Sequence, residues 1–293
     1  MSERRCSFFR SFSIGITWAW LAAFALIPNL ALIMVALLDR SKDSFFIPKF
    51  TFDNFARLFS PEFATVLWDS MVLAGLSTIF CLLFGYPFAY IIARASPKAR
   101  PWLLLLVIIP FWTNSLIRTY ALILILGAQG MINKLLALLH ISPLTLIFND
   151  FAVFVGLTYT LLPFMILPLY ASIEKLEPNL LDAARDLGAT TRRAFWHITL
   201  PLTMPGIVAG SILVFLPSLG MFYVPEILGG ATNLLLGSFI KNQFLIAKDW
   251  PFGAAASSVL TILLVVMALL YRAASRRGRV SDGAIAQIKG GGA

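Results

Sequence analysis

Residues 182–201 read DAARDLGATTRRAFWHITLP, a charged stretch in a chain that is otherwise largely apolar. Around its start, small and apolar residues recur at the i, i+3, i+4, i+7 spacing of a short amphipathic helix. These residues are Leu180, Ala183, Ala184 and Leu187. Pro178 lies where a helix start tolerates a missing N–H, and Gly188 lies where a helix end favours a left-handed residue. The pattern therefore predicts a helix that ends at a glycine corner.

A second short helix is predicted after the corner, with Thr190 or Thr191 as its N-cap and Pro201 closing it before the next apolar run. The two alanines in the middle of the first helix make a shallow face, which fits a groove on another protein. The alternative from the residues alone is a tight cytosolic loop with an ordinary helix end.

The composition indicates a membrane protein that crosses the bilayer several times. Of 293 residues, 59% are hydrophobic and 13% are charged, and the mean hydropathy is +0.85. The net charge is +9. Most lysines and arginines fall in segments expected to face the cytosol, so the excess follows the positive-inside rule and does not indicate nucleic-acid binding. The two cysteines and two histidines form no metal-ligand pattern, so no metal or cofactor is expected in this chain.

Six membrane spans are expected in one transmembrane domain that covers residues 1–293. They are 14–38, 66–93, 102–126, 151–172, 204–224 and 251–271. The run 14–38 is too long for the apolar core of a signal peptide. An even number of spans places both termini in the cytosol, where the long loop 174–201 also lies. The basic, glycine-rich tail 276–293 is expected to be disordered.

Prolines and small residues interrupt several spans. Pro163 and Pro168 predict a bent or broken fourth span, and Pro217 predicts a break near the middle of the fifth. Gly206 and Gly210 predict close packing of the fifth span against a neighbouring helix. Residues expected to lie outside the membrane form short helices near 52–58, 131–140 and 233–247, and Asn149 or Asp150 is expected to cap the fourth span.

The third span carries the polar segment PFWTNSLIRTY, residues 110–120. Pro110 is expected to kink the helix. Asn114 falls a little past the midplane, where exposure to lipid is costly. Its side chain must therefore face another helix or a wet cavity, and hydrogen bonding between packed helices is the simpler alternative.

Residues 182–201 resemble the signature loop of permease subunits of ABC importers, E-A-A-x3-G-x9-I-x-L-P. Ala183, Ala184, Gly188, Ile198, Leu200 and Pro201 fall in register, and Asp182 replaces the usual glutamate. The segments PFWTNSLIRTY and KDWPFGAAAS are similar to those of the polyamine (spermidine/putrescine) uptake branch. The resemblance implies an all-α type I importer permease fold with six transmembrane helices in a bacterial inner membrane.

In that family the loop is the coupling helix that docks into an ATP-binding subunit. The resemblance therefore assigns an ATPase-coupling role to Leu180, Asp182, Ala183, Ala184, Arg185, Leu187, Gly188, Ala189, Ile198, Leu200 and Pro201. It also implies a second permease, two ATP-binding cassette subunits and an extracytoplasmic polyamine-binding protein as partners. No G-x4-G-K-[ST] segment occurs in the chain. The chain is therefore expected to transport and not to hydrolyse ATP, which with Mg²⁺ belongs to the partner.

A pathway for a polyamine should offer carboxylates, amide oxygens and aromatic faces. Candidate residues are Asp69, Trp112, Asn114, Arg118, Tyr159, Tyr223 and Glu226. Glu226 is the simplest hypothesis because it lies beside a proline and near two glycines at the expected outer mouth. The alternative is an ordinary interfacial carboxylate. Arg118 argues against a uniformly acidic pathway and can instead snorkel to the interface or pair with an acid.

The sequence leaves other functions open. A permease of the same architecture could carry iron, thiamine or an opine. A stand-alone channel or ion-driven carrier predicts an acidic relay and an inverted repeat, neither of which is evident in the sequence. A passive membrane scaffold leaves the signature loop unexplained.

Overall fold

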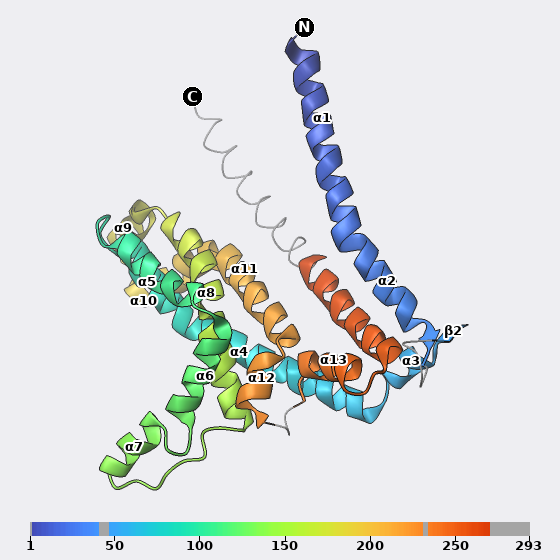
Figure 1. The fold of residues 1–293 in the computed structure, drawn as a ribbon. Helices are drawn as coiled ribbons and strands as arrows, with labels where there is room; N and C mark the ends of the chain where they lie inside the picture. The colour runs from blue at the N-terminus through green and yellow to red at the C-terminus, as the bar shows by residue number, and fades with distance from the viewer. Residues whose placement is uncertain (1, 41–46, 231–233, 270–293) are drawn as a thin grey trace. The chain divides into compact units, whose positions relative to one another are not determined.

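The computed structural model describes residues 2–40, 47–230 and 234–269, and these are mostly helical (Figure 1). The elements are α1 (Ser2–Leu21), the π-helical η1 (Ala22–Leu26), α2 (Ile27–Ala36), β1 (Leu38–Asp39), β2 (Ile47–Phe50), α3 (Asp53–Arg57), α4 (Pro61–Arg94), α5 (Arg100–Trp112), α6 (Ser115–Leu126), α7 (Met131–Leu138), α8 (Asp150–Glu174), α9 (Pro178–Asp186), α10 (Thr191–Ala194), the π-helical η2 (Phe195–Thr199), α11 (Leu200–Gly220), α12 (Tyr223–Leu228), α13 (Leu236–Leu245) and a last helix, Trp250–Leu269. The tail 276–293 lies outside the described residues.

Six helical segments of the described chain are long and apolar enough to cross a membrane. They are Phe12–Ala36, Pro61–Arg94, Ser115–Leu138, Asp150–Glu174, Thr191–Gly220 and Trp250–Leu269. This confirms the expected all-α membrane fold. Short helices are present near the three predicted positions as α3, α7 and α13, but α7 falls inside the segment Ser115–Leu138 and not between two such segments. Asn149 caps α8 as expected, because its Oδ1 accepts the N–H of Ala152 at 2.9 Å.

The third span, expected over 102–126 with a kink at Pro110, consists of two separate helices. Helix α5 ends at Trp112, Thr113 is extended with ψ 150°, and α6 begins only at Ser115. Two side-chain hydrogen bonds hold this break, Thr113 Oγ1 donating to Pro110 O at 2.7 Å and Leu116 N donating to Asn114 Oδ1 at 2.8 Å. Local side chain to backbone bonds of this kind compete with the helix. The interruption therefore lies after Pro110, in the polar residues.

Two other proline predictions also need correction. Of the predicted bend or break at Pro163 and Pro168, the break is excluded because α8 continues through both, and α11 continues past Pro217 to Gly220. The Met221 N–H donates to Pro217 O at 2.9 Å, so Pro217 belongs to the last turn. Membrane helices tolerate such prolines because neighbouring groups satisfy the freed carbonyls.

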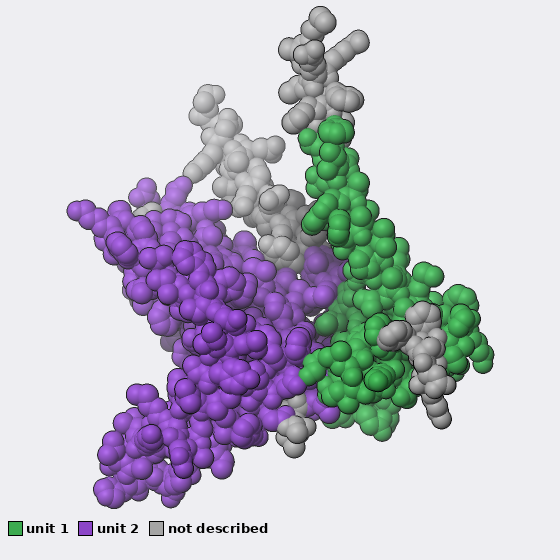
Figure 2. Space-filling model, viewed as in Figure 1, with its two compact units in different colours: residues 1–65, 239–262 green, residues 66–238, 263–293 purple. Residues whose placement is uncertain are grey.

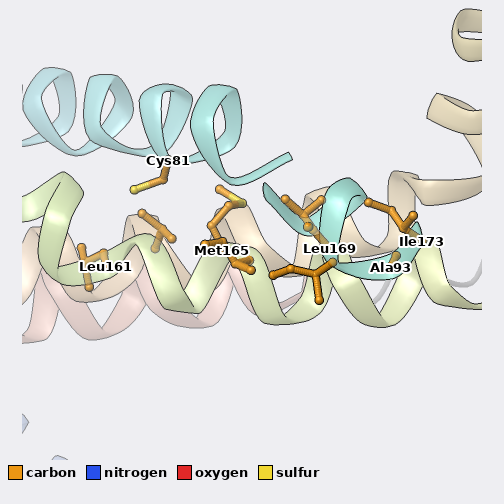
Figure 3. Packing of buried hydrophobic residues seen from close by; sticks show 10 residues of the cluster. Cys81, Ala93, Leu161, Met165, Leu169 and Ile173 are labelled. Carbon is orange, nitrogen blue, oxygen red and sulfur yellow. The ribbon is translucent and has the colours of Figure 1, made fainter. Parts of the chain in front are cut away.

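Contacts divide the chain into two compact units, residues 1–65 with 239–262 and residues 66–238 with 263–293 (Figure 2). The larger unit is built on α8, which packs along α11 and against α4. Leu161, Met165, Leu169 and Ile173 recur along α8 at helical spacing and are all buried (Figure 3). A second cluster joins α8 to α6 and α12 through Leu157, Leu122 and Leu228, among others.

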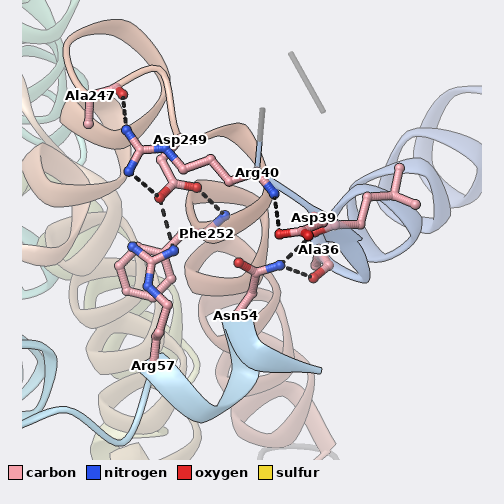
Figure 4. A network of polar contacts seen from close by, with 9 residues as sticks. Ala36, Asp39, Arg40, Asn54, Arg57, Ala247, Asp249 and Phe252 are labelled. Carbon is pink, nitrogen blue, oxygen red and sulfur yellow. Dashed lines mark hydrogen bonds and ion pairs between the residues drawn. The ribbon is translucent and has the colours of Figure 1, made fainter. Parts of the chain in front are cut away.

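The smaller unit is held by a buried carboxylate (Figure 4). The side chain of Asp249 is 1% exposed and lies 2.9 Å from the Arg57 guanidinium and 3.5 Å from that of Arg40. Its Oδ1 accepts the Phe252 N–H at 3.2 Å, so Asp249 also caps the last helix. The Arg57 guanidinium lies 3.9 Å from the centre of the Phe252 ring. A buried charge with these partners fixes the start of the last helix.

Candidate functional site

The glycine corner in the 174–201 loop has the predicted geometry. Gly188 has φ +79°, and two backbone hydrogen bonds at this helix end form a Schellman motif. The Gly188 N–H donates to Arg185 O at 2.8 Å, and the Ala189 N–H donates to Ala184 O at 2.9 Å. A Cβ on Gly188 would meet nothing within 4 Å. Glycine is therefore favoured here by the backbone conformation and not by lack of space.

The helix after the corner differs from the prediction. Thr190 caps α10 as expected, with its Oγ1 accepting the Arg193 N–H at 3.4 Å. Pro201, however, does not close a helix. The chain continues through η2 into α11, with Pro201 in the first turn of α11. The Leu200 N–H bonds Phe195 O, a wider π-type turn. A π-bulge accommodates a residue that cannot make the usual backbone bond. Thr191–Gly220 is thus one helical rod.

One exposed stripe of α9 and its C-cap consists of leucine and alanine, and charged residues lie beside it. Leu187 is 89% exposed and Leu180 is 45% exposed, and Ala183 also faces outward. Ala184, by contrast, is buried. One side of the predicted stripe is therefore covered by the rest of the chain, while the other side is open. An exposed leucine pair beside an alanine has the shape expected of a surface that docks onto another protein.

The charged residues of the loop pair locally. Arg185 donates to Asp182 Oδ1 at 3.1 Å across i, i+3, and both side chains are 63% exposed. An exposed pair of this kind contributes little stability. Both groups therefore remain accessible to a partner. Ile198 and Leu200 are half-buried in η2 and at the start of α11, where they join the loop to the membrane helix.

Helices α8 and α11, on either side of the loop, pack closely through glycine. A Cβ on Gly206 would come within 2.8 Å of Pro168 O, and one on Gly210 would come within 2.7 Å of Met165 Sδ. This confirms the predicted small-residue packing face. The loop is therefore fixed at both ends to one tightly packed helix pair.

The polar residues of the 110–120 segment lie at the α5–α6 break. Trp112 ends α5 with 75% of its surface exposed, and Asn114 uses its side-chain oxygen to cap α6. The Asn114 amide is thus a cap of its own helix. It does not hydrogen-bond another helix within the described residues, which was the alternative drawn from the sequence.

Arg118 of α6 and Tyr159 of α8 come together. The Arg118 guanidinium lies 5.9 Å from the centre of the Tyr159 ring, within the range of a cation–π contact. Its Nε and Nη1 atoms are buried and have no hydrogen-bond partner in the described chain. A polyamine has no strong acceptor for these N–H groups. Arg118 therefore pairs more readily with a carboxylate or carbonyl than with a cation.

The remaining pathway candidates lie on two other elements of the same unit. Asp69 is exposed on α4. Tyr223 begins α12, where its ring lies edge-on to Phe222 at 6.2 Å, and Glu226 is exposed on the same helix. Helix α12 packs against α6 and α8, the helices that carry Arg118 and Tyr159. Within the described residues, no group of three or more His, Cys, Asp or Glu could hold a metal ion.

Comparison with known proteins identifies the family. The family of binding-protein-dependent transport system inner membrane components matches residues 85–280. This chain belongs to that family. It is 48% identical over 270 residues to the spermidine/putrescine transport system permease protein PotB of Haemophilus influenzae, across 92% of this chain and 94% of the relative. It is 51% identical over 259 residues to the protein of that name from Escherichia coli K12, across 88% and 94%.

A solved structure supports the fold of this inner membrane component. A chain of a bacterial ABC transporter involved in the import of the acidic polysaccharide alginate superposes with a TM-score of 0.76 at 20% identity, across 94% of this chain and 97% of that one. The inner membrane component is thus a multi-pass permease subunit with the importer fold, and transport, not catalysis, is its function.

Sequence reasoning missed two features of this permease. The carboxylate of Asp249 gathers Arg40 and Arg57 from segments about 200 residues earlier in the chain. The Tyr86 hydroxyl lies 3.0 Å from Thr203 Oγ1, which joins α4 to α11. The only sequence signal for the first was the position of Asp249 before Trp-Pro at a helix start, a typical N-cap. Nothing in the sequence around Tyr86 or Thr203 indicates that these two residues meet.

Proposed function

We propose that this chain is a permease subunit of an ATP-driven importer of polyamines, spermidine or putrescine. The observation that carries the proposal is the 48–51% identity to permeases named for spermidine/putrescine transport, over about nine-tenths of each chain. Fold alone does not support this substrate, because the same fold serves an acidic polysaccharide importer. Polyamines are cations, so the distinction lies in individual residues.

In the proposed assembly, this permease pairs with a second permease. Two ATP-binding cassette subunits lie on the cytosolic side and hold ATP and Mg²⁺, and an extracytoplasmic binding protein delivers the polyamine. Both termini and the 174–201 loop face the cytosol in this arrangement. The family's dependence on a binding protein supports the last partner.

The 174–201 loop is the coupling element in this proposal. The exposed Leu180, Ala183 and Leu187 are seated in a groove of the ATPase, so the permease follows when ATP binding closes the two ATPase subunits. The Schellman corner at Gly188 keeps α9 at a fixed angle to the rod Thr191–Gly220. The close glycine packing of α11 on α8 then transmits the displacement into the membrane as a rigid-body movement. If the corner were flexible or the helix pair loosely packed, the displacement of the loop would not reach the membrane helices.

The substrate pathway is proposed to run past the polar groups of α6, α8 and α12. Glu226 supplies a carboxylate for an ammonium group, and the Tyr159 and Tyr223 rings supply faces for cation–π contacts. Trp112 and Asp69 offer the same chemistry at exposed positions of α5 and α4. Arg118 is proposed to orient the Tyr159 ring. Its positive charge is also proposed to weaken binding of the cation in the pathway, so that the polyamine can be released.

Uptake of radiolabelled spermidine and putrescine tests this function. Cells that lack other polyamine importers would express the chain with its second permease, ATPase and binding protein. We expect saturable, ATP-dependent uptake that needs all four components. Uptake of molybdate, iron or thiamine in place of polyamine by the same complete assembly would contradict the substrate but not the permease function.

A further inference from the structure

A cavity of about 680 Å³ lies between α4 and the coupling loop. Tyr86, Tyr90 and Ile91 of α4 form one wall, and Phe195 of η2 contributes to the opposite wall. Arg185 of α9 and Arg192 of α10 line it from the loop. Its size falls in the range of about 300–1,000 Å³ that is typical of pockets for small molecules. The cavity does not belong to the proposed substrate pathway, whose candidates lie on other parts of these helices or on other elements.

The aromatic wall of the cavity is held rigidly. The Tyr86 ring lies edge-on to Phe195, with ring centres 5.6 Å apart, and its hydroxyl contacts the buried Thr203 at 3.0 Å. Tyr90 carries the Arg94 guanidinium 5.7 Å from its ring centre. The apolar surface of the cavity is therefore preformed and does not depend on the entry of a ligand.

The charge of the cavity is positive on one side. Both arginines of the lining are exposed, and no carboxylate of the described chain lines the cavity. Arg185 has its ion pair with Asp182, whereas Arg192 forms no side-chain hydrogen bond or ion pair with any described residue. The uncompensated charge of Arg192, with no acid in the lining, disfavours a polycation. The cavity is therefore not a second site for the transported substrate.

An apolar, aromatic wall beside a basic rim fits a ligand with an anionic head and an apolar chain. Basic pockets beside membrane helices on the cytoplasmic side suit the headgroups of anionic lipids, and a guanidinium binds a phosphate in a fork of two N–H groups. We propose that this cavity binds an anionic membrane phospholipid, whose phosphate lies between Arg185 and Arg192 and whose acyl chain lies along Tyr90 and Ile91. The placement in the inner leaflet rests on the proposed cytosolic position of the loop.

A lipid bound in this way joins the membrane helix α4 to both arms of the coupling loop. It fills a cavity that would otherwise let the loop move relative to α4. Anionic lipid should therefore raise the number of polyamines transported per ATP hydrolysed, and not the affinity for the polyamine. This effect distinguishes a structural lipid from a substrate-like ligand.

Lipid retention in the purified four-component importer tests the proposal. The complex is exchanged into detergent with equal amounts of phosphatidylglycerol and phosphatidylcholine, and bound lipid is measured by native mass spectrometry. We expect retained phosphatidylglycerol in the wild type, and at least a threefold loss in Arg192→Gln, which removes the unpaired charge. Ile91→Trp, which fills the cavity without changing its charge, should lose as much. Excess inorganic phosphate should not displace the lipid.

The matched control is Arg193→Gln, which removes a charge one residue away, from an exposed side chain outside the cavity lining. Its lipid retention should equal that of the wild type. Equal loss in Arg193→Gln would overturn the proposal in favour of diffuse attraction to a basic surface. Unchanged retention in Ile91→Trp would overturn it in favour of lipid held outside the cavity, and no retained lipid in the wild type would overturn it in favour of a cavity that holds no lipid. Each readout is independent of which solute the importer carries.

Discussion

At the scale of single residues, Gly188 is the position where conformation and proposed function meet most closely. Its left-handed φ lets the backbone of α9 turn and form both bonds of the Schellman motif. No neighbour lies within 4 Å of where a Cβ would be. A substitution here therefore changes the backbone preference without creating a clash, which makes its effect simple to interpret.

We expect Gly188→Ala to destabilise the corner by about 1–2 kcal/mol, the cost of the left-handed conformation for a residue with a Cβ. Gly188→Asn should be milder because asparagine tolerates this region. Polyamine uptake and co-purification of the ATPase subunit should fall in the order Gly, Asn, Ala, Val. Wild-type uptake and full ATPase retention in Gly188→Val would contradict the role of the corner.

Glu226 is the second residue-scale prediction. Glu226→Gln removes a carboxylate proposed to meet an ammonium group, so the KM for polyamine uptake should rise roughly two- to fivefold, as for loss of an exposed charge pair worth up to about 1 kcal/mol. ATP turnover without polyamine should not change. Glu62→Gln, which alters an exposed carboxylate at the start of α4, serves as the control. An unchanged KM in Glu226→Gln would remove Glu226 from the pathway.

At the scale of elements, the loop and the pair α8–α11 form one mechanical part. Helix α11 continues the rod that starts at Thr191, and its glycines approach the α8 backbone and Met165. The π-turn at η2 lets this rod pass Pro201 without a break. Continuity of the rod and closeness of the seam are both needed if a push on the loop is to move the membrane helices together.

Gly210→Ala tests the seam. The new Cβ would lie 2.7 Å from Met165 Sδ and 3.2 Å from Met165 O, so the buried Met165 side chain must move and the α8 backbone must shift by a few tenths of an ångström. We expect a loss of about 1–3 kcal/mol of stability and a lower ratio of transport to ATP hydrolysis. Thermal unfolding of the purified complex and paired uptake and ATPase assays would measure both. Gly75→Ala, where nothing lies within 4 Å of the new Cβ, should behave as wild type.

How far the sequence predicted each element depends on the range of the interactions that fix it. The Gly188 corner, the Thr190 cap and the Asn149 cap arise from neighbours in the chain, and their positions were predicted correctly. The breaks expected at Pro201 and Pro217 did not occur. A π-turn directly precedes Pro201, and Pro217 lies in the last turn of α11. The real break in the third span came from hydrogen bonds of Thr113 and Asn114, which no periodicity reveals.

At the scale of the whole molecule, the features that need long-range contacts were the ones that the sequence could not supply. The Asp249 network, the Tyr86–Thr203 contact and the cavity beside the loop each join segments about a hundred or more residues apart in the chain. The family, by contrast, followed from one short motif together with the number of spans. The proposed transport of polyamines depends on both kinds of feature, because the motif supplies coupling and the tertiary structure supplies the pathway.

Cysteine cross-linking from Leu187 tests the central claim, that an exposed cytosolic face of α9 docks into the ATPase. In a complex with Cys6 and Cys81 replaced by serine, Leu187→Cys should cross-link to the ATPase subunit and should react with an impermeant thiol reagent only in inverted vesicles. Asn179→Cys, exposed at the start of the same helix, provides the control for reactivity. Labelling of Leu187→Cys from the outside of intact cells, with no cross-link to the ATPase while uptake continues, would contradict the account.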